Sequence, residues 1–154
     1  MVFLGPAPTH VDAEQKYPKG EIGYDNAGNE YIYLPGVSSC AARDAVVFDE
    51  DYATTRLAPD EVGPVAIATA AVDATTKFGW FGRKGVFAVN SDTVAADAIL
   101  FIDTGAGRVD DASVAGDTII GLYSMTTDTY SGAANITKCY ANYPQVTNNN
   151  GLST

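Results

Sequence analysis

Acidic side chains are the residues of this sequence that could most readily do chemistry. They gather in two short runs, Asp49-Glu50-Asp51 and Asp110-Asp111, and a third segment, residues 25–29, begins with Asp and contains Asn and Gly. Carboxylate oxygens bind calcium when they recur at alternate positions of a loop that a glutamate closes at its twelfth position. None of the three segments has this spacing, so we interpret them as solvated loop charges and expect no metal site.

A further aspartate, Asp103, stands in a motif with a catalytic meaning. Residues 101–106 read Phe-Ile-Asp-Thr-Gly-Ala, and they resemble the active-site signature of retroviral-type aspartic proteases. In those enzymes two facing carboxylates share a proton, so that one acts as a base and the other as an acid. The similar family places a long flap between this triplet and a later Ile-Ile-Gly segment. Here residues 119–121 follow after a short acidic loop, and Arg108 stands close to Asp103. We therefore predict that Asp103 is not catalytic and that the chain is not an enzyme.

The other reactive residue types offer no catalytic set. The single histidine, His10, lies in a proline-rich segment, so we expect no Ser/His or Cys/His pair. Cys40 and Cys139 are far apart and match no zinc or redox spacing, and the sequence leaves open whether they pair. We expect no cofactor.

Length and charge exclude several classes of protein. The chain has 154 residues, of which 46% are hydrophobic, enough for one domain with its own core. It carries 19 acidic and 9 basic residues, a net charge of −10. Nucleic acids and anionic membranes attract positive surfaces, so we expect neither as a partner. No signal peptide and no long apolar run is visible, and we expect a soluble chain in a reducing compartment.

Short runs of β-branched and aromatic residues alternate with turn-forming residues along the whole chain. The runs lie at residues 31–34, 45–48, 65–72, 77–81, 85–89 and 133–140, and at the ends of two similar units, residues 94–100 and 114–120. This spacing predicts an all-β fold, a single β-sandwich or barrel-like domain of the β-tulip or jelly-roll kind. We place the domain at residues 20–145, after an extended N-terminal arm (1–19) and before a polar tail (146–154).

The order of several short motifs between residues 20 and 144 resembles the small capsid decoration, or cement, proteins of tailed bacteriophages. The first motifs are Gly-Tyr-Asp and Gly-Asn-Glu-Tyr at 23–31, Gly-Pro-Val-Ala-Ile-Ala at 63–68, and Phe-Gly-Trp at 78–80, which leads into Lys-Gly-Val-Phe-Ala-Val at 84–89. Two Val-Ala-x-Asp-x-Ile units follow at 94–99 and 114–119, with Ala-Gly-Arg-Val at 106–109 between them. The last motif is Ile-Ile-Gly-Leu at 119–122.

This resemblance implies a β-rich protomer, usually a homotrimer, on the outer surface of an expanded icosahedral head. There it would bridge major capsid protein subunits and stabilise the head against internal DNA pressure. Its location would be the virion, and the host cytoplasm during assembly. The alternatives are the aspartic protease above, and a glycan- or receptor-binding β module of a phage fibre or spike.

Two sets of apolar residues are the expected contact sites. In the N-terminal arm, prolines hold the chain extended, which lowers the entropy lost on docking, and such an arm can add as a strand to an exposed sheet edge. We expect it to anchor the protein to the capsid, the alternative being a disordered tail. Its residues are Phe3, Leu4, Pro6, Pro8 and Val11.

The second set is an aromatic cluster between glycines. Phe78, Trp80 and Phe81 have Gly79, Gly82 and Gly85 as neighbours, which leave little bulk to cover the rings. Such a cluster is either core, a carbohydrate-binding platform or a subunit interface. We predict that part of it is buried between the protomers of a homotrimer.

Overall fold

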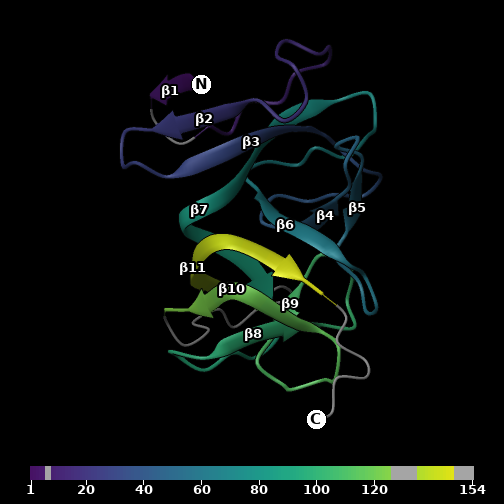
Figure 1. The fold of residues 1–154 in the computed structure, drawn as a ribbon, viewed down its shortest axis with the longest axis vertical. Helices are drawn as coiled ribbons and strands as arrows, with labels where there is room; N and C mark the ends of the chain where they lie inside the picture. Colours follow the sequence, from purple (N-terminus) through teal and green to yellow (C-terminus); the bar gives the residue numbers. More distant parts are fainter. Residues whose placement is uncertain (6–7, 126–134, 148–154) are drawn as a thin grey trace.

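The computed structural model describes residues 1–5, 8–125 and 135–147. Every regular element within these residues is a strand, which confirms the all-β prediction (Figure 1). In chain order the strands are β1 (Val2–Gly5), β2 (Ile22–Asp25), β3 (Glu30–Pro35), β4 (Ala45–Phe48), β5 (Thr54–Arg56), β6 (Gly63–Ala68), β7 (Phe78–Ser91), β8 (Ile99–Ile102), β9 (Val109–Asp110), β10 (Thr118–Ser124) and β11 (Asn135–Val146). The described part of the chain contains no helix that could cross a membrane.

The eleven strands form one mixed sheet. Its order is β1-β2-β3-β7-β9-β8-β10-β11-β6-β4-β5, and β7 also pairs with β6 and β11. Most neighbours are antiparallel, as short turns between strands require. The exceptions are β1 with β2 and β7 with β9, which run parallel.

Strand β7 joins the two halves of the molecule. Its first half pairs with β3 and its second half, from Lys84 to Ser91, pairs with β11. Gly85 lies where the partners change and has a φ of 126°, a backbone conformation that L side chains rarely adopt. The side chain of Asn29 fills the space beside Gly85, and its Oδ1 accepts a hydrogen bond from the Val86 amide at 3.0 Å. A glycine is therefore needed at this bend.

Strands in the middle of the fold are covered on both faces. In β3, Tyr31 and Tyr33 point into one apolar cluster, whereas Ile32 and Leu34 point into a second cluster on the opposite face. Three strands in the second half of the chain differ from β3. In β8, β10 and β11 buried residues alternate with exposed ones, so these strands bury only one face. The other face of β8, β10 and β11 is open to solvent.

Candidate functional site

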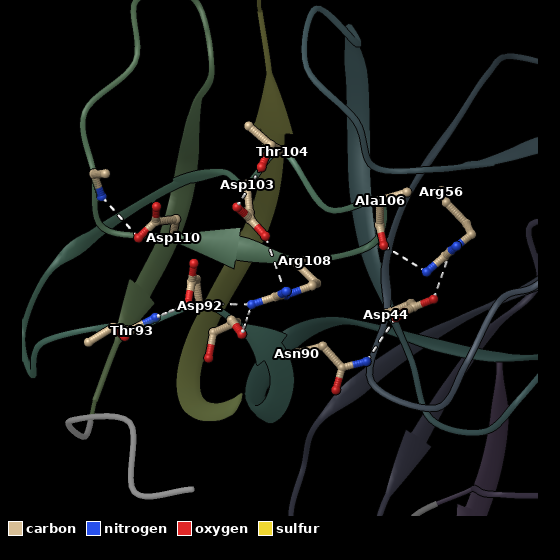
Figure 2. A network of polar contacts seen from close by, with 12 residues as sticks. Asp44, Arg56, Asn90, Asp92, Thr93, Asp103, Thr104, Ala106, Arg108 and Asp110 are labelled. Carbon is tan, nitrogen blue, oxygen red and sulfur yellow. Dashed lines mark hydrogen bonds and ion pairs between the residues drawn. The ribbon is translucent and has the colours of Figure 1, made fainter. Parts of the chain in front are cut away.

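The aspartate of the protease-like triplet is held by an arginine of its own turn (Figure 2). Asp103 follows β8 directly, and its amide donates to the carbonyl of Arg108 at 3.2 Å, which closes the turn into β9. The Nε of Arg108 lies 3.3 Å from Oδ2 of Asp103. On its other side, Nη2 of Arg108 donates to the carbonyl of Ser91 at 2.8 Å and lies 3.6 Å from Oδ1 of Asp92. The guanidinium thus stands between two carboxylates.

This geometry suits a structural role for Asp103. A catalytic pair of aspartates works because two carboxylates face each other and one of them keeps a proton. In this chain Asp103 is buried and faces the guanidinium of Arg108 rather than a second carboxylate. These contacts give Asp103 the role of fixing the turn, and the absence of catalysis at Asp103 stays a prediction.

A second buried aspartate, which the sequence analysis did not single out, attaches the same turn to the rest of the fold. Asp44 accepts hydrogen bonds from Nε of Arg56 at 2.9 Å and from Nδ2 of Asn90 at 2.8 Å. Arg56 also donates from Nη2 to the carbonyl of Ala106 at 2.7 Å (Figure 2). These partners come from segments far apart in sequence, so no local motif marks them.

The acidic runs bind their own backbone. Oδ1 of Asp49 accepts from the amides of Asp51 and Ala53, at 3.0 and 2.8 Å. Oδ1 of Asp110 accepts from the amides of Asp111 and Ala112, at 2.6 and 3.2 Å. Among residues 1–5, 8–125 and 135–147, no group of three or more His, Cys, Asp or Glu could hold a metal ion. These carboxylates stabilise turns.

The two cysteines are buried, free, and in separate apolar clusters. Burial raises the pKa of the Cys40 thiol to about 11 and that of the Cys139 thiol to about 12. Because the thiolate is the reactive form, neither side chain suits nucleophilic chemistry. His10 contacts no cysteine; its Nε2 lies 3.1 Å from Oδ1 of Asp12.

The aromatic cluster predicted to lie between subunits is mostly core. Trp80 and Phe81 are buried within one chain, and Phe78 is half-buried. The Trp80 ring packs against Tyr33 and Tyr17, with centroids 5.1 and 5.4 Å apart. These rings supply the bulk that the neighbouring glycines lack beside Trp80, and Phe81 is buried in the second apolar cluster. The glycines therefore do not leave Trp80 and Phe81 uncovered within one chain. The covered Trp80 ring also offers no platform for a sugar.

The N-terminal arm is extended, and much of it packs on its own chain. Val2–Gly5 forms β1, and Leu4 packs against the core beside Gly23 and Trp80. Pro8 is buried and Val11 packs against the second cluster. Pro6 lies outside the described residues.

Asp12 and Phe3 show which part of the arm belongs to the fold and which part is exposed. The backbone of Asp12 pairs with Phe78, and its carboxylate accepts a hydrogen bond from the Tyr33 hydroxyl at 2.8 Å, so this part belongs to the fold. Phe3 is different: its side chain is 73% exposed. Of the predicted anchor residues that the structure describes, Phe3 is exposed, Leu4 and Val11 are half-buried, and Pro8 is buried.

A larger exposed apolar surface lies on one face of β7, β8, β10 and β11, where the sequence analysis placed no site. We call it the Tyr123 face, and it comprises Val86 and Ala88 of β7, Ile99 of β8, Ile120 and Tyr123 of β10, and Lys138 and Tyr140 of β11, with Lys84 at its border. Ile99, Ile120, Tyr123 and Tyr140 are exposed by 53, 46, 45 and 40%. Their strand neighbours on the opposite face, among them Leu100, Ile119, Leu122 and Cys139, are fully buried. The sequence does carry a signal for this surface: in β8 and β10 apolar residues occupy consecutive positions, so that both faces of each strand carry them.

Comparison of the chain with protein-family models, with curated protein sequences and with solved structures gives no match.

Proposed function

We propose that this chain is a structural protein that binds the outside of a tailed-bacteriophage head and stabilises it by bridging major capsid protein subunits. Two observations support the proposal: the order of the sequence motifs, and the free sheet edge at β1, to which a capsid strand could bind. In this proposal the chain acts as a homotrimer on the outer capsid surface, and its sheet closes as a β-sandwich or barrel-like domain.

Strand β1 presents an edge that is open to a partner strand. It stands last in the sheet order and pairs with β2 on one side, and within the described residues no strand covers its other side. Soluble proteins usually protect such edges with charges, prolines or bulges that prevent pairing with another chain. The sequence of β1, Val-Phe-Leu-Gly, contains no charge and no proline, and the one irregularity in its pairing with β2 lies between Phe3 and Gly5.

The exposed side chain of Phe3 stands on this open edge. A partner strand that pairs with β1 would gain backbone hydrogen bonds along the edge, and a pocket for Phe3 would give specificity. Many copies on one head add avidity, so that each contact needs only modest affinity. An open edge with one apolar anchor therefore suits a protein that decorates a large regular surface.

Co-sedimentation with purified expanded heads that lack the chain tests the proposal. Wild type should sediment with the heads, and Phe3→Ser should bind at least about tenfold more weakly, since an anchoring aromatic contributes more than about 1.4 kcal/mol. Val62→Ser is the matched control, because Val62 is also an exposed apolar residue but lies outside β1 and the Tyr123 face. Failure of the wild-type chain to bind heads would overturn the proposed function.

A further inference from the structure

We propose that the Tyr123 face is a second docking surface, and that it receives a protein surface with an apolar centre bordered by carboxylates. The inference rests on the proposed function and deepens it, because a chain that bridges two subunits needs two separate contact surfaces.

The face is continuous across four strands. Tyr123 of β10 lies opposite Ile99 of β8 on one side and opposite Tyr140 of β11 on the other. Tyr140 in turn lies opposite Val86 of β7. Directly opposed residues of neighbouring strands are in side-chain contact distance. The four residues therefore form one row, and contiguous exposed apolar surface of this kind marks interaction sites.

The strands turn their apolar residues outward without needing them for the core. Leu100, Leu122 and Ala141 already fill the buried face, and each is fully covered. Gly121, with a φ of 83°, forms an irregularity between Ile120 and Leu122 that leaves both Ile120 and Tyr123 exposed. Surface strands that serve folding alone usually alternate apolar and polar residues. The outward aromatic row therefore points to a partner.

Charge indicates what kind of partner fits. The chain carries a net charge of −10, yet residues 84–91, 99–102, 118–124 and 135–146 contain no Asp and no Glu. The basic residues of these four segments are Lys84 and Lys138, and both are exposed. The acidic loops of this molecule would repel an acidic partner, so these strands offer it a less repulsive approach than those loops.

The two lysines stand on opposite sides of the apolar row. Lys84 comes two residues before Val86 on β7, and Lys138 comes two residues before Tyr140 on β11, which runs antiparallel to β7. Two residues along a strand span about 7 Å. A complementary surface therefore has an apolar centre over Tyr140 and Val86, with a carboxylate within reach of each lysine.

The Tyr123 face lies away from the β1 edge. Figure 1 shows β1 near one end of the long axis, and β8 and β10 in the opposite half. One neighbouring capsid subunit can then hold the β1 edge while another holds the Tyr123 face. This separation is what a bridging role requires.

Binding of variants to the same purified heads tests the inference. Tyr123→Ser removes the centre of the row, and Lys138→Glu reverses a border charge while leaving the row intact. Both side chains are exposed, so both variants should keep the wild-type circular dichroism spectrum. We expect each to bind heads at least tenfold more weakly than wild type, with the loss in Lys138→Glu shrinking as salt is added.

Two controls match these variants. Val62→Ser removes an exposed apolar side chain elsewhere, and Lys19→Glu makes the same change in net charge away from the face; both should bind like wild type. If wild type binds and Tyr123→Ser and Lys138→Glu bind equally well, the second docking surface is overturned and the proposed function stands. If Tyr123→Ser instead breaks up an oligomer of the free chain without weakening head binding, the face belongs to a second copy and the inference is overturned. If wild type does not bind, both proposals fail.

Discussion

Single carboxylates in this chain serve mainly as hydrogen-bond acceptors for their own backbone and neighbours. Asp25 accepts from the amides of Ala27 and Asn29, each at 2.9 Å, from Nδ2 of Asn29 and from the hydroxyl of Tyr31 at 2.7 Å. Burial alone would raise the pKa of Asp25, but the hydrogen bonds from Asn29, Tyr31 and Ala27 together lower it. The ionised carboxylate therefore stabilises the folded chain.

Replacing Asp25 tests this role. At neutral pH, Asp25→Asn should lower the free energy of unfolding by about 1–3 kcal/mol, because an amide leaves buried donors without an acceptor. A lowered folded-state pKa means that the stabilisation is complete above the ordinary pKa of aspartate and is lost as the pH falls through the lowered value. Urea unfolding should show the difference from wild type shrinking at acidic pH. Glu14→Gln, at an exposed position, should be indistinguishable from wild type. A constant difference between Asp25→Asn and wild type at every pH would contradict the role of the charge.

Asp103 provides the residue-scale test of catalysis. Its partner is Arg108, so we expect no peptide hydrolysis at acidic pH that depends on this carboxylate. The measurement is cleavage of unfolded protein substrate by wild type and by Asp103→Asn. Hydrolysis by wild type that disappears in the variant would show that Asp103 is catalytic.

Among the elements, the turn between β8 and β9 depends on the close approach of backbone to a buried carboxylate. Gly107 has a φ of 81°, and a Cβ there would stand 2.6 Å from Cγ of Asp44. Gly28 has nearly the same φ, 80°, with no atom within 4 Å of the added carbon. Substitutions at the two glycines can therefore distinguish the cost of a left-handed backbone from the cost of crowding by Asp44.

Alanine at each position measures the two contributions. Gly28→Ala should cost about 1–2 kcal/mol, the strain of a left-handed backbone at an L residue. Gly107→Ala should cost at least about 1 kcal/mol more. Asp44 must shift away from Arg56 and Asn90, which weakens the hydrogen bonds that both residues donate to its carboxylate. Thermal or urea unfolding gives both values. Equal losses would mean that Asp44 does not constrain this turn.

Local patterns predicted several elements, although the runs at 77–81 and 85–89 form one strand, β7, and not two. The run at residues 45–48 is β4 with the expected bounds, and the two similar units at 94–100 and 114–120 lead into β8 and β10, which pair with each other. Arg108 was placed near Asp103 because only five positions separate them. Alternation, turn residues and short separations are properties of a local segment, and a sequence displays them directly.

Contacts between distant segments were not visible in the sequence. Trp80 is buried because Tyr17 and Tyr33 pack on it, and Asp44 is satisfied by Arg56 and Asn90. The sequence did not predict the Tyr123 face, because its residues come from four strands and their register is defined only by the folded sheet. The proposed Tyr123 docking surface depends on such contacts between distant segments.

The whole molecule carries a charge that its fold must tolerate. With a net charge of −10, like charges repel across the surface, and the ion pairs that involve exposed groups contribute little. Added sodium chloride screens this repulsion over distances beyond about 10 Å at 0.1 M. We therefore expect the unfolding temperature to rise with salt, and Lys19→Glu to lower it more at low salt than at high salt. A fall of the unfolding temperature with salt would show that attractive pairs dominate.

Electron microscopy of heads incubated with the chain is the most direct test of its proposed place in the virion. Density for the chain is expected on the outside of the expanded head, with the β1 edge against one major capsid protein subunit and the Tyr123 face against a neighbouring subunit. Heads that remain bare, or that carry the chain with both surfaces turned to solvent, would contradict the proposed bridging role.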